Sequence, residues 1–382
     1  FHRDTTELSP SPSRHVTVRI SPGTAYCLQD TTRLHAAIQT NQAPEHQPLI
    51  RCNQKPYQDT SMKPTQPVKP NSNITALLES MSRTGFQGRK LGESLGIWTR
   101  MITDPDCTVF MGLSGAMIPA GMQNVLIDLV RHRYVDVIVS TGANIFHDTC
   151  EHLGVRHYLG HHHADDTALF EEGIDRIYDV FAYEEEFRNV DAEIARFAGA
   201  IAPFRGSSRE FTRHLGDWLR ENRPEGQSLV ATCAECNVPI FIPALCDSSI
   251  GIGLVMARRR GVEIDIDQLA DTDEITRVVE GARKTGVIYI GGGVPKNFIQ
   301  QTQVIASIHE QNLGGHAYAI QYTTDAPHWG GLSGCTFEEA ISWGKEAPES
   351  LRVQCFCDAT IALPIVASGL IGSGVKRARR AP

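Results

Sequence analysis

The chain has 382 residues, of which 41% are apolar, so it is long enough for one large α/β domain with a sizeable core and additional segments. Its formal net charge of −8 gives no basis for bulk nucleic-acid binding, and no apolar run approaches the roughly 18 residues of a membrane-spanning helix. Ten cysteines in a chain of this length do not form the pattern of a small disulfide scaffold. We therefore expect reduced thiols and a cytoplasmic protein without a secretory signal, with neither nucleic acid nor membrane as a partner.

Residues 1–73 differ in composition from the rest of the chain. Segments such as "ELSPSPSR" and "MKPTQPVKPNSN" are rich in Pro, Ser, Gln and Asn. Such a composition buries too little apolar surface to offset the entropy lost on ordering. We expect a largely disordered extension, with one run at 15–20 that alternates like an edge strand.

From residue 74 onward, short apolar runs alternate with helical patterns. The runs expected to be strands are 107–112, 135–141, 238–243, 286–292, 316–321 and 352–357. Continuous apolar strands between helices predict a mostly parallel sheet covered on both faces, the α/β class. Residues 151–237 read as a mostly helical insertion, residues 74–372 as the folded domain, and residues 373–382 as a basic, solvated tail.

Glycine- and serine-rich segments follow five of these strands. They are 112–121, 140–148, 243–253, 291–297 and 322–334. Parallel sheets bind ligands beyond the carboxyl ends of their strands, where glycine lets the backbone approach a phosphate. Each segment alone is equally consistent with a tight turn, but the five together favour a nucleotide site.

Two acids, Asp247 and Asp358, each follow a strand. A carboxylate there can accept hydrogen bonds from a ribose, but aspartate is also favoured as the N-cap of a following helix. The two roles can coexist. The consecutive histidines in "GHHHADD" (160–166) point in different directions, and "CAEC" (233–236) lacks a second pair, so we expect no metal site.

The segment "TFEEAISWGKEAP" (336–348) contains Thr336 and Glu339 at the spacing of a capping box. Lys345 then falls in the expected last turn of the helix, where a cation is favoured by about 0.3–1 kcal/mol. Helix propensity therefore offers an account of Lys345 that needs no chemistry.

Several longer motifs change that interpretation. "TGFQGRKLG", "VDVIVSTGANIFHD", "IPALCDSSIG", "GGGVPKN", "LSGCTFEEAISWGK" and "CDATIALP" occur in the order found in the deoxyhypusine synthase family, over about residues 82–367. The chain resembles in particular the bacterial branch called deoxyhypusine synthase-like. The resemblance implies a Rossmann-like, doubly wound fold and a homotetramer with sites between subunits.

The family's chemistry is an NAD-dependent aminobutyl transfer from spermidine with no net redox change. The resemblance implies that Lys345 is the nucleophile that forms an imine (Schiff base) with the polyamine-derived group. The acceptor would be a lysine of the hypusine-bearing translation factor, or a small amine as in homospermidine synthesis. The alternative is an NAD-binding regulatory or structural homo-oligomer without transferase activity.

The family's site residues carry over as follows. Those that would contact NAD are Ser114, Thr141, Gly142, Asp247, Gly292, Thr324, Asp325, Asp358 and Ala359. Those that would contact the polyamine are Asn297, Glu339 and Trp343. Ile341 and Trp343 offer an apolar surround for a lysine that must be neutral when it attacks.

Several acids that the family uses to hold a polycation are replaced. Phe146 and His147 stand where the eukaryotic enzyme has two acids, Ile252 and Leu332 replace two others, and Asn297 replaces a histidine. Each lost charge-assisted hydrogen bond is worth roughly 1.5–3 kcal/mol. We therefore expect altered recognition of the amine donor or acceptor.

Overall fold

A computed structural model describes residues 63–308 and 313–378. The edge strand expected at 15–20 lies outside these residues. The described residues from Pro64 onward form one compact unit. Its first helix, α2 (Ile74–Met81), begins where the composition changes, and the Asn73 side chain caps it by accepting a hydrogen bond from the Ala76 backbone N–H at 3.0 Å.

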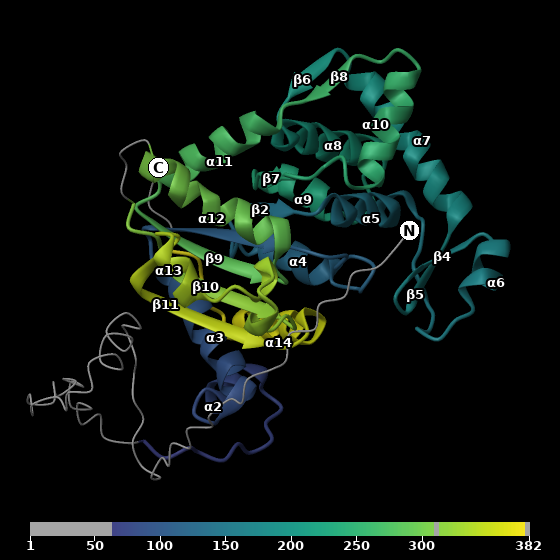
Figure 1. Cartoon of the computed structure of the whole chain (residues 1–382). Helices are drawn as coiled ribbons and strands as arrows, with labels where there is room; N and C mark the ends of the chain where they lie inside the picture. The colour runs from purple at the N-terminus through teal and green to yellow at the C-terminus, as the bar shows by residue number, and fades with distance from the viewer. Residues whose placement is uncertain (1–62, 309–312, 379–382) are drawn as a thin grey trace, which may run out of the picture. The chain divides into compact units, whose positions relative to one another are not determined.

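In the described part of the chain, a central sheet has the strand order β11-β10-β9-β1-β2-β7 (Figure 1). Its strands are β1 (Cys107–Leu113), β2 (Val137–Ser140), β7 (Ile240–Phe241), β9 (Lys284–Ile290), β10 (His316–Thr323) and β11 (Glu346–Phe356). Every pairing between neighbours in this sheet is parallel. The predicted α/β fold with a doubly wound, mostly parallel sheet is confirmed.

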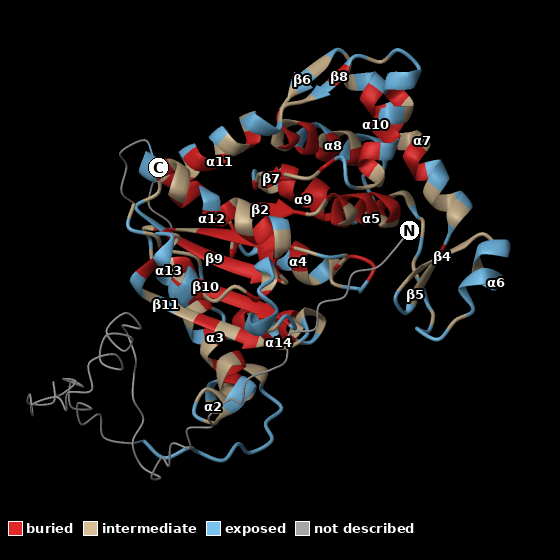
Figure 2. Cartoon of the chain, in the orientation of Figure 1, coloured by how far each residue is buried: buried red, intermediate tan, exposed pale blue. Residues whose placement is uncertain are grey.

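The strands are buried on both faces because their side chains alternate between two apolar clusters. Phe110 and Val139 belong to one cluster, and their neighbours Met111 and Ile138 belong to the other. The first cluster is closed by α11 (Gln268–Gly281), α12 (Gly293–Ile308) and α13 (Phe337–Ser342). The second is closed by α3 (Phe86–Thr103), α4 (Gln123–Arg131), α9 (Leu229–Cys236) and α14 (Ala359–Gly372). Figure 2 shows the resulting buried layer in red along the strands.

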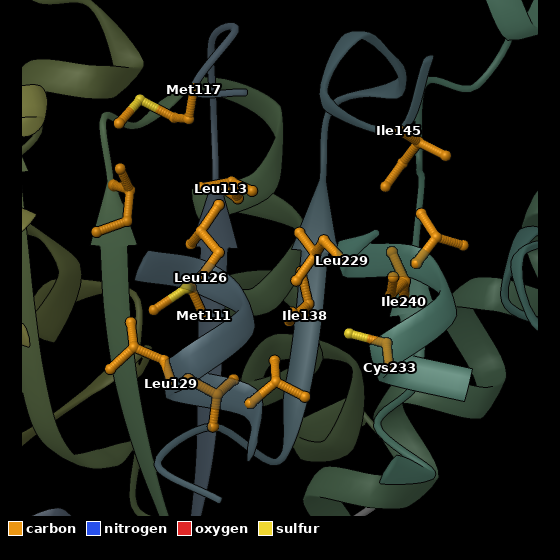
Figure 3. Close-up of a cluster of buried hydrophobic side chains, with 14 of the residues drawn as sticks. Met111, Leu113, Met117, Leu126, Leu129, Ile138, Ile145, Leu229, Cys233 and Ile240 are labelled. Atoms are coloured by element: carbon orange, nitrogen blue, oxygen red, sulfur yellow. The ribbon is translucent and has the colours of Figure 1, made fainter. Parts of the chain in front are cut away.

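Figure 3 shows how this second cluster joins strands and helices. Met111 and Leu113 of β1 and Ile138 of β2 lie with Leu126 and Leu129 of α4. All are nearly inaccessible to solvent. Burying each such side chain contributes about 1.5–3 kcal/mol, so this cluster holds the strand ends that carry the candidate site in fixed positions.

The strand order contains one topological switch. The chain runs outward from β1 through β2 to β7, then returns to β9 on the other side of β1 and continues through β10 to β11 (Figure 1). The loops after β1 and β9 therefore leave in opposite directions, which opens a crevice at the carboxyl ends of these two strands.

Residues 151–237 are mostly helical, as predicted, but they also contain strands that the prediction did not include. The helices near this region are α5 (Gly142–Leu153), α6 (Asp166–Glu171), α7 (Glu184–Ile201), α8 (Ser208–Asn222) and α10 (Ser249–Arg259). The additional strands are β3 (Tyr158–Leu159), β4 (Ile174–Ile177), β5 (Val180–Tyr183) and β6 (Phe204–Gly206), of which β6 pairs with β8 (Ile264–Ile266). The hairpin β4–β5 turns at Tyr178, whose φ of 57° is unusual for a residue other than glycine. Because the turn has Tyr178 and not glycine at this positive φ, the sequence offers no glycine from which the hairpin could be predicted.

The expectation of a solvated basic tail is wrong for Arg377. Its side chain is only 10% exposed and forms an ion pair with Asp136 at 2.6 Å. It also donates a hydrogen bond to the Met101 carbonyl at 2.9 Å. The guanidinium thus satisfies backbone and carboxylate acceptors near the amino end of β1. None of the helices in the described residues combines the length and the apolar character needed to cross a bilayer.

Candidate functional site

The carboxyl ends of four neighbouring strands surround one pocket of about 320 Å³. Six of the nine residues predicted to contact NAD line it: Ser114, Gly292, Thr324, Asp325, Asp358 and Ala359. They come from the ends of β1, β9, β10 and β11, so the pocket lies at the topological switch and extends toward the sheet edge. The structure therefore brings together most of the predicted cofactor residues.

Glycine makes this crevice possible. Gly291 has a φ of 78°, and a Cβ atom on Gly292 would lie 2.6 Å from Ser333 Cα. Ser114 Oγ donates a hydrogen bond to the Gly292 carbonyl, and the Gly293 N–H donates one to Ser333 Oγ at 3.0 Å. Any larger residue at position 292 would push the 333 loop away from the strand ends.

Asp358 combines two roles in this pocket. It is the N-cap of α14, because Oδ1 accepts hydrogen bonds from the Thr360 backbone N–H at 2.7 Å and from Thr360 Oγ1 at 2.6 Å. The residue is exposed at the pocket wall. One carboxylate oxygen can therefore cap the helix while the other is available to a ligand hydroxyl.

Thr141, Gly142 and Asp247 do not line this pocket. Thr141 caps α5 and its Oγ1 donates to the Gly115 carbonyl at 2.8 Å, which connects it to the turn after β1. A Cβ on Gly142 would lie 2.2 Å from Ser248 Oγ. Asp247 is exposed, and Ser248 occupies the N-cap position of α10, so the cap interpretation of Asp247 is wrong.

Lys345 does not lie in the last turn of a helix, contrary to the expectation. Helix α13 ends at Ser342, and Gly344 follows with a φ of 68°. The Lys345 N–H donates to the Ala340 carbonyl at 3.1 Å and the Gly344 N–H donates to the Ile341 carbonyl at 2.9 Å. These two bonds form a Schellman motif, which places Lys345 outside the helix and immediately before β11.

The Lys345 ammonium is held by two of its predicted neighbours. Nζ donates to Asn297 Oδ1 at 3.2 Å and lies 5.3 Å from the centre of the Trp343 ring. Lys345 is half-buried, whereas the Trp343 side chain is 64% exposed. Glu339 is exposed in the first turn of α13, where its N–H donates to Thr336 Oγ1 at 3.1 Å. An ammonium group near an indole face gains about 0.5–1 kcal/mol, so this arrangement suits a cationic amine.

The first turn of α12 connects the two halves of the site. Gly292, just before this helix, lines the pocket, and Asn297 in the helix contacts Lys345. Lys345, Asn297, Glu339 and Trp343 are not among the residues that line the pocket. The candidate site therefore has two parts joined by this turn, the pocket lined by Gly292 and the lysine group bonded to Asn297.

Sequence reasoning missed the buried polar residues of α12. Lys296 and Gln300 are 0% exposed and Gln303 is 4% exposed, and all three lie on the face of the helix that packs on the sheet. Burial lowers the pKa of Lys296 to about 8. The signal was available, because the spacing i, i+4, i+7 puts these polar side chains on the same face as the apolar residues of the helix.

Two of the positions where acids are replaced, Phe146 and His147, belong to an aromatic cluster. Phe146 and His147 are buried in α5, and their rings pack against Phe187 with centroids 5.5 and 5.4 Å away. His147 Nδ1 and His157 Nε2 are 3.0 Å apart, and burial lowers the pKa of His147 to about 3. Ile252 and Leu332 are 52% and 41% exposed. A neutral His147 adds no negative charge to attract a polyamine.

The histidines of "GHHHADD" lie in an exposed loop, which agrees with the solvated-loop interpretation. Within residues 63–308 and 313–378, no group of three or more His, Cys, Asp or Glu side chains is placed to hold a metal ion. The eight cysteines in the described ranges are free thiols.

The chain is similar to known proteins over most of its length. The sequence profile described as deoxyhypusine synthase matches residues 76–370. The chain is 58% identical over 308 residues to the "Probable deoxyhypusine synthase 2" of Methanosarcina acetivorans, across 80% of this chain and 89% of that protein. It is 40% identical over 299 residues to the "Deoxyhypusine synthase-like protein" of Chlorobaculum tepidum, across 77% and 85% of the two chains.

A solved structure shares the fold. The crystal structure of a putative deoxyhypusine synthase from Entamoeba histolytica superposes with a TM-score of 0.57 at 19% identity, covering 82% of this chain and 98% of that chain. At this identity the likeness concerns the fold alone. With the profile match and the relatives above, these findings establish that the chain belongs to the deoxyhypusine synthase family.

Proposed function

We propose that the protein is an NAD-dependent aminobutyl transferase that moves a group from spermidine or a related polyamine through an imine on Lys345 to an acceptor amine. Family membership supports the transferase class. The observation that carries the proposal is the placement of Lys345 against Asn297 and Trp343, beside a glycine-walled crevice.

The crevice fits NAD in three respects. It lies at the topological switch of a doubly wound sheet, its wall at Gly292 admits no Cβ, and Asp358 offers a carboxylate oxygen beyond its capping bond. Bound NAD would accept a hydride from the donor amine and return it at the end, which leaves no net redox change. Ser114, Gly292, Thr324, Asp325, Asp358 and Ala359 would hold it directly, with Thr141, Gly142 and Asp247 further along the same edge of the sheet.

The protein's own residues supply the transfer step. The Lys345 amine would attack the imine carbon of the oxidised donor and form a new C=N bond. The donor's own imine nitrogen would leave with the diamine fragment and take the two amine protons of Lys345. The acceptor amine would then attack the same carbon and release Lys345. Asn297 Oδ1 accepts from Nζ and so orients the lysine, while Trp343 and Glu339 are suited to a second ammonium of the donor.

The replaced acids affect which substrate the site can bind, and they leave Lys345 and its contacts unchanged. With Phe146 and a neutral His147 packed into an aromatic cluster, the site has fewer carboxylates with which to bind a polycation. Both acceptor classes remain compatible with the site: a lysine of a translation factor, or a small amine. This same loss favours the second candidate function, an NAD-binding regulatory homo-oligomer without transfer.

Borohydride trapping separates the two functions. The protein is incubated with NAD and each of several amines, spermidine first, then reduced and weighed by mass spectrometry. A mass increase that needs both NAD and amine supports the transferase. NAD binding without a mass increase for any amine supports the binding protein.

A further inference from the structure

Lys296 is an ammonium group buried in the protein interior. The residue is 0% exposed, and Nζ donates to Gln321 Oε1 at 3.0 Å and to the Cys335 carbonyl at 2.6 Å. The rings of Tyr289 and Phe337 lie 6.0 and 5.8 Å away. Burying a charge costs free energy unless hydrogen bonds compensate for the lost water. The bonds to Gln321 and Cys335 are therefore needed to keep a charged lysine at this position.

The acceptors of Lys296 belong to one network. Gln354 Nε2 donates to Gln321 Oε1 at 2.8 Å and to the Cys335 carbonyl at 3.2 Å. Gln321 Nε2 donates to the carbonyls of Gly291 and Ser333, each at 2.8 Å. The network therefore holds the segment 333–335 against the ends of β9, β10 and β11.

The segment held in this way leads directly to the candidate nucleophile. Cys335 precedes Thr336, the N-cap of α13, and α13 has only six residues before the Schellman turn at Lys345. So short a helix has little stability of its own, so its position depends on tertiary contacts such as those at Cys335 and the buried Phe337. Asn297, which follows Lys296 in α12, accepts a hydrogen bond from Lys345 Nζ. Adjacent residues of α12 therefore contact both Cys335, before α13, and Lys345, after it.

We propose that Lys296 is a positioning residue that fixes α13 against α12 and thereby holds Lys345 Nζ at Asn297, in line with the nucleotide crevice. This inference rests on the proposed function. Lys296 is no nucleophile itself, because its amine is fully buried and bonded to two acceptors. Burial lowers its pKa to about 8, so at neutral pH it remains mostly protonated and donates to both.

The test uses Lys296→Met, which keeps the length of the side chain and removes its donors, and Gln354→Met, which removes two bonds of the same network. The rate of borohydride trapping at Lys345 with NAD and spermidine is compared with NAD affinity. Lys296→Met should lower the trapping rate about 100-fold at nearly unchanged NAD affinity, since a misplacement of about 1 Å costs that much. Gln354→Met should give a smaller loss in the same direction.

Asp271→Ala serves as the control for lost stability alone. Asp271 is also 0% exposed and accepts from the backbone N–H groups of Ser208 and Arg209 at 3.0 and 3.1 Å, far along the chain from Lys345. It should lower the melting temperature without changing the trapping rate. Equal trapping rates in wild type and Lys296→Met would overturn the inference.

Hydrogen exchange provides a readout that does not depend on transfer. The amides of Cys335, Ala340 and Lys345 donate backbone hydrogen bonds around α13. They should exchange faster in Lys296→Met and not in Asp271→Ala. Unchanged protection in Lys296→Met would overturn the positioning role. Absent trapping in the wild type with every amine, combined with this faster exchange, would refute the proposed function and leave the positioning role standing.

Discussion

At the scale of single residues, similar sequence signals led to different local structures. Asp247 and Asp358 each follow a strand, and both were predicted to contact NAD, with a capping role open for each. Only Asp358 caps a helix, because the turn after β7 places Ser248 and not Asp247 at the N-cap position of α10. Which of two adjacent residues becomes the cap depends on loop geometry that one sequence does not reveal.

Because only Asp358 caps a helix, replacing Asp358 and replacing Asp247 should have different effects on stability. Asp358→Ala should weaken NAD binding and also lower the free energy of unfolding by about 0.5–2 kcal/mol, because the cap of α14 is lost. Asp247→Ala should weaken NAD binding while leaving stability within about 0.5 kcal/mol, since Asp247 is exposed and caps nothing. Calorimetric titration with NAD and urea unfolding measure the two effects. Unchanged NAD affinity in both variants would place the nucleotide elsewhere.

Glu346 follows Lys345 and is 1% exposed. Oε1 accepts from Gln300 Nε2 at 3.3 Å, while Glu346 Oε2 and Gln300 Oε1 have no partner among the described residues. Burial raises the pKa of Glu346 to about 8. The folded state therefore keeps a proton that the unfolded state releases above its ordinary pKa of 4.5, so stability is lost as pH rises from 4.5 through 8.

Glu346→Gln should remove this loss, because an amide cannot ionise and can still donate to a neighbouring oxygen. The free energy of unfolding of wild type and variant, measured by urea unfolding at pH 5 and pH 9, tests this expectation. The variant should gain on the order of 4 kcal/mol relative to wild type between the two pH values. A difference between variant and wild type that is the same at both pH values would contradict the assignment.

At the scale of elements, the sequence predicted what depends on local pattern and missed what depends on packing. The strand β1 was predictable because a continuous apolar run needs burial on both faces. The hairpin at Tyr178 was not, because its positive φ occurs without glycine. Helix α13 ends at Ser342 and so does not include Lys345, which was expected in its last turn, although Gly344 was a visible signal for a helix end. The role of Lys296 depends on Gln321 and Cys335, which are distant in sequence.

Gly344→Ala tests how α13 presents Lys345. A Cβ there meets no atom within 4 Å, so the cost comes from the φ of 68° alone. We expect a loss of about 1 kcal/mol in the free energy of unfolding and a clear drop in trapping at Lys345, with NAD affinity retained. Gly330→Ala, at a φ of 66° and also without nearby atoms, is the matched control for strain outside the Schellman turn. If both variants trap at the wild-type rate, the turn does not position the lysine.

At the scale of the whole molecule, large apolar side chains face solvent in the segment 329–343 that leads to the lysine. Trp329, Leu332 and Trp343 are 76%, 41% and 64% exposed. A lysine that must attack as a neutral amine benefits from a drier environment than this surface provides. The exposed apolar groups of this segment are consistent with the homotetramer that the family resemblance implies, in which another subunit would cover them.

Light scattering should give a mass about four times the 42.0 kDa of one chain. Trp329→Glu should lower that mass and the trapping rate together, because a carboxylate would be buried in the interface. Leu269→Glu, at a residue that is 82% exposed on α11, should change neither. A monomer of 42.0 kDa that traps amine at full rate would refute the assembly.

The central claim is that Lys345 is a covalent nucleophile, and the most direct test is the mass of its peptide after borohydride trapping. Wild type and Lys345→Arg are each incubated with NAD and spermidine, reduced and digested. Arginine keeps the positive charge but has no primary amine to form an imine. We expect an aminobutyl mass on the wild-type Lys345 peptide and none in the variant, with fold and NAD binding retained. Transfer by Lys345→Arg at the wild-type rate, or trapping on another lysine, would contradict the account.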